Sequence, residues 1–231
     1  MTQDAHGYRD HEHIKSFAIR ATRMSPAQRR DYEELHDRYC VPYSERSIDP
    51  RGLFSKPDNR LFVEIGFGMG DATAEMAHGL PATNFLGVEV HKPGVGKLLG
   101  AIRRMGLENV RIIEADAVFV VEKMIPISSV DGFLVFFPDP WPKTRHHKRR
   151  IIRPGFVRDL AARLRPGGFV YCATDWAEYA EQMLEVFAGE PSLRNPHDGP
   201  APRQPWRPVT SFETKGRNAG RDIHEVYFER Q

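Results

Sequence analysis

The residues best suited to chemistry in this sequence are three acids, each at the end of a short apolar run or just beyond it. Glu64 lies directly ahead of a glycine-rich turn, Glu89 follows the next apolar run, and Asp116 follows the one after that. The turn contains three glycines, whose missing side chains let the backbone approach a ligand closely: Gly66, Gly68 and Gly70. If the apolar runs are parallel strands, the acids and the turn meet at one edge of a sheet, where open α/β sheets bind ligands.

A glycine-rich turn of this kind also occurs in dinucleotide-binding proteins, so a pyrophosphate is the first ligand to consider. Their fingerprint is GxGxxG, whereas here the third glycine comes one residue early, at Gly70, and Asp71 stands in the expected place. Glu64 would in addition repel a pyrophosphate. For the glycines taken alone, a tight turn without any ligand is the other alternative.

A cationic nucleoside fits the acids better than a dinucleotide does. Glu64 can attract the positively charged end of S-adenosylmethionine, and Glu89 can accept hydrogen bonds from both ribose hydroxyls. Methyltransferases bind the adenine amino group at the place occupied here by Asp116 and Ala117. One such acid could be an exposed strand-end residue, but three in register favour a methyltransferase pocket for S-adenosylmethionine.

A proline-rich loop that contains Asp139 follows a fourth apolar run and leads into a strongly basic stretch. Residues 136–150 read FFPDPWPKTRHHKRR. The prolines stiffen the loop, and Trp141 suits either stacking on a base or packing against the protein. The net charge is only +2, from 33 basic and 31 acidic residues, so the basic residues matter through their clustering. This cluster and a second one suit a polyanion docked on one face, with solvated surface charge as the alternative; the second comprises Lys15, Arg20, Arg23, Arg29 and Arg30.

The loop and its basic stretch resemble the hallmark of the bacterial tRNA (guanine-N7)-methyltransferase family, a PDPW loop followed by a KxRHxKRR run. Both are unbroken here, and the resemblance extends to Ser16–Phe17, Glu64–Gly70, Gly87–His91 and Arg207–Glu213. It covers nearly the whole chain after residue 13. The resemblance implies a class I methyltransferase that uses S-adenosylmethionine to methylate N7 of a guanine in tRNA, a variable-loop guanine by the family's preference.

The resemblance also implies roles for individual residues. Asp139 matches the family's catalytic aspartate and is expected to contact the cofactor as well. Guanine N7 carries a lone pair and no proton, so Asp139 is expected to orient the base and stabilise developing positive charge, and not to act as a base. The implied substrate-binding residues are Lys143, Asp175, Thr210, Ser211, Phe212 and Glu213. The residues implied to contact RNA are Arg145, His146, His147, Lys148, Arg149 and Arg150.

Two of these implied roles have alternatives. Asp175 would accept hydrogen bonds from N1 and the exocyclic amine of guanine, or else cap the helix that follows it. Ser211 stands where the family often carries lysine, so the resemblance supports backbone contacts there but not a contact by a charged side chain.

Alternating apolar runs and amphipathic stretches predict the elements that must position these residues. Strands are predicted at residues 61–65, 84–90, 110–114, 130–137, 169–173, 209–212 and 223–228, and helices at 71–78, 96–105, 117–124, 156–164 and 176–188. Residues 189–208 contain six prolines and are predicted to be a loop. The pattern predicts an α/β, Rossmann-like fold with a mostly parallel seven-stranded sheet covered by helices on both faces. Residues 59–231 are predicted to form this methyltransferase domain, and residues 1–58 a partly flexible N-terminal extension that is a candidate for RNA contact.

Composition excludes several other classes of protein. Hydrophobic residues make up 40% of the chain, and no apolar run approaches the ~20 residues that span a bilayer. The polar N-terminus lacks the apolar stretch of a secretory signal, so a cytoplasmic location is expected. Cys40 and Cys172 are predicted to be free thiols. Neither His11 nor His13 has further ligands at metal-binding spacing, and no metal is expected in the chemistry.

Two other functions are less well supported by the sequence. Methyltransferases that act on exocyclic amines often carry an Asp/Asn-Pro-Pro-aromatic loop, but Trp141 stands where the second proline would be. A catalytically silent RNA-binding protein with this fold is disfavoured because the acids of the pocket and Asp139 are all present.

Overall fold

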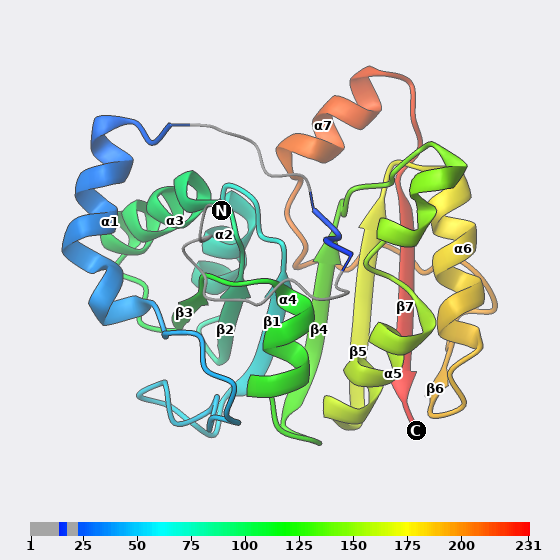
Figure 1. Cartoon of the computed structure of the whole chain (residues 1–231), viewed down its shortest axis with the longest axis horizontal. Helices are drawn as coiled ribbons and strands as arrows, with labels where there is room; N and C mark the ends of the chain where they lie inside the picture. Colours follow the sequence, from blue (N-terminus) through cyan, green and yellow to red (C-terminus); the bar gives the residue numbers. More distant parts are fainter. Residues whose placement is uncertain (1–13, 18–22) are drawn as a thin grey trace.

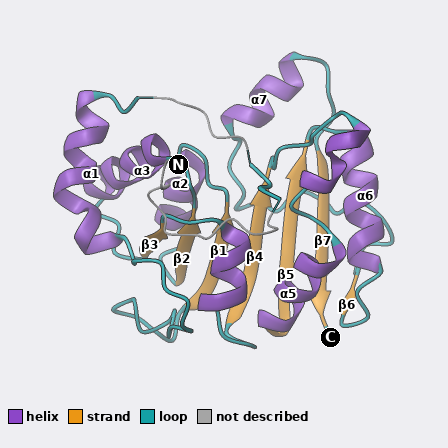
Figure 2. Cartoon of the chain, viewed as in Figure 1, coloured by secondary structure: helices purple, strands orange, loops and turns teal. Residues whose placement is uncertain are grey.

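A seven-stranded sheet with helices on both of its faces dominates the computed structural model, which describes residues 14–17 and 23–231 (Figures 1 and 2). The predictions that concern His11, His13 and Arg20 lie outside these residues. The strands are β1 Arg60–Ile65, β2 Thr83–Val88, β3 Val110–Ile113, β4 Val130–Phe136, β5 Leu164–Thr174, β6 Leu193–Arg194 and β7 His224–Arg230. The helices are α1 Pro26–Tyr39, α2 Asp71–Gly79, α3 Lys92–Met105, α4 Ala117–Phe119, α5 Pro154–Arg163, α6 Ala177–Ala188 and α7 Ser211–Asn218, with a π-helical turn η1 Val120–Met124 and a 3-10 helix η2 Thr144–Arg149.

The order of the strands across the sheet is β3-β2-β1-β4-β5-β7-β6. The first five of these are parallel to their neighbours, whereas β7 runs antiparallel to β5 and β6 antiparallel to β7. The predicted fold class, a mostly parallel Rossmann-like sheet of seven strands, is therefore confirmed. Because β1 lies between β2 and β4, the chain reverses its direction of progress across the sheet at β1, and a ligand crevice is expected there.

Side chains of each central strand alternate between two hydrophobic clusters, one on each face of the sheet. In β1, Leu61 and Val63 face the cluster formed with η1, α5 and α6, whereas Phe62 faces the cluster formed with α2 and α3. Glu64 has the parity of Phe62, so its carboxylate is directed to the α2 side. The apolar run that predicted β1 therefore also determines the face of the sheet on which Glu64 lies.

Two predictions for the C-terminal part of the chain were wrong. Residues 209–212 were predicted to be a strand, but Thr210 is the N-cap of α7, and its hydroxyl accepts a hydrogen bond from the backbone N–H of Glu213. The apolar residues that suggested a strand, Val209 and Phe212, are 59% and 46% exposed. The seventh strand is instead the two-residue β6, which lies inside the segment predicted to be a loop.

Helix α1 was not predicted, although its start carries a recognisable signal. Ser25 and Gln28 form a capping box with Pro26 in the first turn. Gly96 and Gly100 let α1 approach α3 closely, because a Cβ at Gly96 would lie 2.7 Å from the backbone oxygen of Gln28. The described part of the predicted N-terminal extension therefore packs against the rest of the domain. Among the described residues, no helix is long and apolar enough to cross a membrane.

Candidate active site

The carboxyl ends of β1, β2 and β3 bring the three predicted cofactor-binding acids to one edge of the sheet. Glu64 is the second-to-last residue of β1, Glu89 directly follows β2, and Asp116 follows β3 and caps α4. Strand-like hydrogen bonding continues past the strand ends, since the N–H of Gly66 donates to Val88 O and the N–H of Glu89 donates to Ile113 O. The structure therefore brings together residues that are separated by whole helices in the sequence.

The glycine turn after β1 has a conformation that only glycine adopts easily. Its three glycines have φ values of 73°, 60° and 75°, in the order Gly66, Gly68 and Gly70. The carboxylate of Glu89 holds the turn by accepting a hydrogen bond of 2.7 Å from the N–H of Gly68. Burial raises the pKa of Glu89, although three backbone N–H donors partly offset the rise. Glu89 therefore shapes the turn, because its two carboxylate oxygens accept from the backbone N–H groups of Gly68, Val90 and His91.

Glu64 is a buried acid whose charge is not compensated by any described cation. Its side chain is 2% exposed, and its Oε2 atom has no hydrogen-bond partner among the described residues. Burial raises the pKa of Glu64 to about 7. An uncompensated buried carboxylate costs several kcal/mol of stability, so this site suits a ligand that brings a positive charge.

Asp116 shapes the opposite side of the same edge. Its side chain, only 4% exposed, accepts a hydrogen bond of 3.0 Å from the backbone N–H of Val118. Ala117 then begins α4. One carboxylate oxygen of Asp116 therefore caps α4, and this hydrogen bond fixes the orientation of the carboxylate.

Asp139 is exposed on a loop whose backbone is held in an unusual shape. Phe137 and Trp141, on either side of it, have φ values of 52° and 44°, a left-handed conformation that costs a non-glycine residue roughly 1–2 kcal/mol. The loop keeps this shape because the N–H of Phe137 donates to Ala173 O at 2.7 Å and the Arg150 side chain donates to Pro140 O at 2.9 Å. Asp139 is thereby fixed just beyond the carboxyl end of β4, the strand that pairs with β1.

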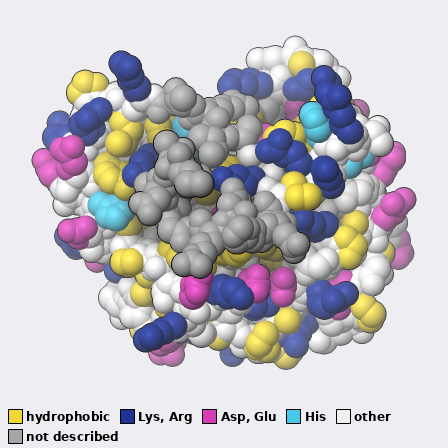
Figure 3. All heavy atoms as spheres, in the orientation of Figure 1, with side chains coloured by type: hydrophobic (Ala, Val, Ile, Leu, Met, Phe, Trp, Pro, Cys, Tyr) yellow, Lys and Arg dark blue, Asp and Glu magenta, His cyan; other side chains and the backbone are white. Residues whose placement is uncertain are grey.

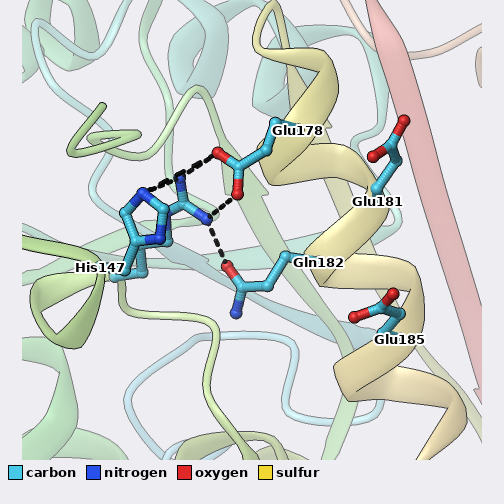
Figure 4. A pocket seen from close by; sticks show the side chains of 6 residues that line it. His147, Glu178, Glu181, Gln182 and Glu185 are labelled. Carbon is cyan, nitrogen blue, oxygen red and sulfur yellow. Dashed lines mark hydrogen bonds and ion pairs between the residues drawn. The ribbon is translucent and has the colours of Figure 1, made fainter. Parts of the chain in front are cut away.

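The basic stretch after this loop divides into cations that face solvent and cations that face the protein. Lys143, Arg145 and Lys148 are exposed. Lys and Arg side chains gather on the upper right of the molecular face shown in Figure 3. Arg150 is different, since it is only 2% exposed and pairs with Glu178 on α6 (Figure 4). The guanidinium of Arg150 fastens the loop to α6, and its contact with RNA stays a prediction. His146 and His147 are half-buried.

Arg149 and Trp141 bind the described N-terminal segment, residues 14–17. The indole N–H of Trp141 donates to Ser16 O at 3.1 Å, and the Nε of Arg149 donates to Lys15 O at 3.2 Å. The Arg149 guanidinium also lies 3.9 Å from the centre of the Trp141 ring. Of the two roles considered for Trp141, packing against the protein is the one that this arrangement shows.

Helix α7 lies over the carboxyl edge of the sheet, where Phe212 stacks on Phe137 with 6.4 Å between ring centroids (Figure 1). Its first turn is fixed from below by Arg207, which is fully buried and pairs with Glu213 of α7 and Glu225 of β7 at 2.8 and 2.5 Å. Burial by itself raises the pKa of Glu213, but the cations of Arg207 and Arg203 outweigh it and hold that pKa below its usual value. Glu213 has no exposed surface and anchors α7 through these pairs, and its substrate contact stays a prediction.

Asp175 and Asp139 follow the carboxyl ends of two neighbouring strands, because β4 and β5 are paired at Phe136 and Ala173 just before the two acids. The alternative role as a helix cap does not occur, since α6 begins after Trp176 without a side-chain cap. The carboxylate instead accepts two hydrogen-bonding contacts from the guanidinium of Arg221, which the sequence analysis did not single out.

Comparison with known proteins identifies the family of this chain. Residues 58–226 match the family described as "Putative methyltransferase". The chain is 51% identical to the tRNA (guanine-N(7)-)-methyltransferase of Paraburkholderia xenovorans (strain LB400) over 218 residues, 94% of this chain and 84% of that relative. The identity to the tRNA (guanine-N(7)-)-methyltransferase of Ralstonia nicotianae is also 51%, over 94% of this chain and 87% of the relative. This chain belongs to the tRNA (guanine-N(7)-)-methyltransferase family.

A solved structure agrees with the fold of this family member. The crystal structure of the 16S rRNA methyltransferase KamB has a TM-score of 0.57 and 16% identity, with 92% of this chain and 96% of that chain covered. At this identity the likeness concerns the fold alone. The resemblance predicted from the PDPW loop and the basic run is thus confirmed by the relatives, and the fold is confirmed independently by the neighbour.

The two arginines that sequence reasoning missed in this methyltransferase are Arg207 and Arg221. Arg207 lies in the segment that carries the family resemblance, but nothing in its local sequence distinguishes a buried cation from a surface one. Arg221 follows α7 in a polar stretch and meets Asp175 only through the tertiary fold. Charge pairing between such distant positions leaves no periodic signal in a single sequence.

We predict that Arg207→Met strongly destabilises the protein, because it leaves Glu225 without its cation and Glu213 with only the more exposed Arg203 and Arg217. The expected loss in the free energy of unfolding is about 3–5 kcal/mol, measured by urea denaturation. The matched control is Arg194→Met, which removes a pair at 2.9 Å with another β7 acid, Glu229, but from an arginine that is 61% exposed. That change should cost at most about 1 kcal/mol. Equal losses in the two variants would show that burial of the charge cluster is not what anchors α7.

Proposed function

We propose that this protein transfers a methyl group from S-adenosylmethionine to N7 of a guanine in tRNA. The observation that carries the proposal is that the family's unbroken PDPW loop holds an exposed Asp139 beside the strand edge where the other acids meet. The printed names of the relatives, tRNA (guanine-N(7)-)-methyltransferase, support the same substrate and position. A tRNA substrate also agrees with the predicted cytoplasmic location.

The residues of the strand edge fit S-adenosylmethionine by their chemistry. Glu64 is a buried acid without a partner for Oε2 among the described residues, which suits the cofactor's positively charged end. Glu89 would accept from the ribose hydroxyls, and Asp116 with Ala117 would bind the adenine amino group. The positive φ angles of the glycine turn let its backbone approach the cofactor closely, where a Cβ at Gly66 would enter open space. When bound, the cofactor supplies an electrophilic methyl group on a sulfonium.

The residues of the chain would act by orientation and electrostatics. Guanine N7 offers a lone pair, so no proton has to be removed before attack on the methyl group. Asp139 would hold the base in line and stabilise the positive charge that the purine gains, as a preorganised charge does in a fixed loop. Asp175 would accept from N1–H and the exocyclic amine on the other edge of the guanine.

Phosphate contacts would come from the solvent-facing cations beside Asp139. These are Lys143, Arg145 and Lys148, with His146 and His147 next to them. The start of α7, formed by Thr210, Ser211 and Phe212, borders the same edge and is proposed to contact the substrate as well. Phosphates held at these cations would bring a guanine within reach of Asp139.

The first test of this function is the change Asp139→Ala. Because Asp139 is exposed, the variant should keep its thermal stability while its turnover falls by about 10²–10³-fold. Labelled methyl transfer to bulk tRNA, followed by nucleoside analysis for N7-methylguanosine, measures both product and rate. Asp58→Ala, an exposed acid ahead of the amino end of β1, is the control and should leave turnover unchanged. Near-normal turnover in a folded Asp139→Ala enzyme would contradict the role assigned to this residue.

A second prediction concerns the pH dependence of cofactor binding. With the pKa of Glu64 near 7, the free protein carries mostly the neutral acid below that pH, whereas a cationic ligand binds the carboxylate. Affinity for S-adenosylmethionine should therefore rise with pH, by roughly tenfold per pH unit below the pKa. The same shift affects stability without cofactor, because the pKa of Glu64 is raised from its ordinary value of 4.5 to about 7. The contribution of Glu64 to the free energy of unfolding is therefore fully present below pH 4.5 and is lost as the pH rises through about 7.

Titration calorimetry at about pH 6 and about pH 8 measures the effect on binding. Glu64→Gln has the same shape without a titrating group, so it should bind the cofactor more weakly and lose this part of the pH dependence. If wild type and Glu64→Gln show the same pH dependence, the buried acid does not meet the cofactor's charge.

A third prediction separates exposed cations from the buried one. The double change Arg145→Ala with Lys148→Ala should weaken tRNA binding and reduce the slope of log affinity against log salt by about 1.5. Arg150→Ala should leave that slope unchanged but lower the free energy of unfolding by about 1–3 kcal/mol, because its buried hydrogen bonds are lost. Filter binding at several salt concentrations and thermal denaturation measure the two effects. A reduced salt slope for Arg150→Ala would show that Arg150 contacts RNA as well.

A further inference from the structure

Arg221 and Asp175 form a pair at the edge of the sheet that carries the proposed base site. The Nε and Nη2 atoms of Arg221 lie 2.8 and 2.7 Å from Oδ2 of Asp175. The other oxygen, Oδ1, accepts no hydrogen bond from any residue that the structure describes. Because a carboxylate has about four acceptor positions, the pair leaves room for a second set of donors.

The position of Arg221 is fixed by the end of α7. Gly216 packs directly on Asp175, since a Cβ at this glycine would lie 2.8 Å from both Cβ and Oδ2 of the acid. The carbonyl oxygen of Gly216 also accepts from the N–H of Arg221, and Gly220 between them has a φ of 70° that closes the turn. The same residue therefore touches Asp175 and directs Arg221 back toward it.

We propose that Arg221 is a positioning residue for base recognition, which orients the Asp175 carboxylate toward the N1–H and 2-amino group of the target guanine. This inference rests on the proposed function. Two charge-assisted contacts from the guanidinium fix the position of Oδ2. Gly216, packed against Cβ and Oδ2, restricts rotation of the side chain, so that Oδ1 is held in one orientation. The buried Arg207 cluster fixes the position of α7, and the end of α7 fixes the position of Arg221. Selectivity for guanine therefore depends on how α7 is anchored to the sheet.

The test compares two tRNA transcripts that differ only at the target nucleotide, which is guanosine in one and inosine in the other. Inosine keeps N7 and N1–H but lacks the 2-amino group, so the ratio of kcat/KM for the two transcripts reports how well that group is recognised. The wild-type enzyme should prefer guanosine by roughly tenfold or more. Arg221→Ala should lose at least about tenfold in kcat/KM on guanosine, and its preference should shrink toward one.

Two further variants separate positioning from other roles of Arg221. Arg221→Lys keeps the charge without the planar fork, so it should recover binding of tRNA more fully than it recovers the preference for guanosine. Arg217→Ala removes a cation of α7 that is 60% exposed and pairs with Glu213, not with Asp175. Arg203 and Arg207 still pair with Glu213 in this variant, so α7 stays anchored. It should change kcat/KM for both transcripts by the same factor and leave the preference as in wild type.

The outcomes distinguish this inference from the proposed function. A wild-type enzyme that makes no N7-methylguanosine contradicts the proposed function itself. Normal methylation of guanosine with an unchanged preference in Arg221→Ala would overturn the positioning role. Equal losses on both transcripts would also overturn it and would indicate a phosphate contact instead. Thermal denaturation of each variant checks the fold, and Arg221→Lys provides the readout if Arg221→Ala does not fold.

Discussion

Parallel pairing of β1 with both β2 and β4 is the constraint on which the rest of this structure depends. It sends the carboxyl ends of the central strands to one edge, so that Glu64, Glu89 and Asp139 face a common region although helices separate them in the chain. The pairing is stabilised by apolar side chains on both faces, and the acids sit where the apolar runs end. The hydrophobic core therefore determines where the charges of the site can lie.

A second layer of the site depends on a buried charge cluster. Arg207 has no exposed surface and joins Glu213, Glu225 and Tyr171, and so ties the start of α7 to β5 and β7. Breaking a buried cluster of this kind costs far more than breaking a surface pair. The helix that covers the sheet edge is thereby held rigidly. Phe212 in its first turn reaches the glycine turn, and Arg221, just after its last turn, reaches Asp175.

The basic stretch after Asp139 illustrates how one run of like charges serves two purposes. Arg150 is buried against Glu178 and Pro140, and Arg149 lies on Trp141 and binds the backbone of residues 14–17. The neighbouring Arg145 and Lys148 face solvent. Some cations thus keep the loop in its left-handed conformation around Asp139, whereas others remain available to a polyanion.

Sequence alone determined the sheet, the glycine turn with its acids and the family, because these follow from periodic apolar runs and from motifs that are contiguous in the chain. It did not distinguish Arg150 from Lys148, since burial of a charge depends on a partner such as Glu178 on a distant helix. It also misjudged residues 209–212, where two exposed apolar residues imitated a strand and Thr210 in fact caps a helix. The predicted cofactor and substrate roles of Glu89, Asp116 and Lys143 stay predictions. Only the tertiary structure decided that Glu213 anchors α7 and that Arg221 meets Asp175, because such contacts join side chains that local sequence does not relate.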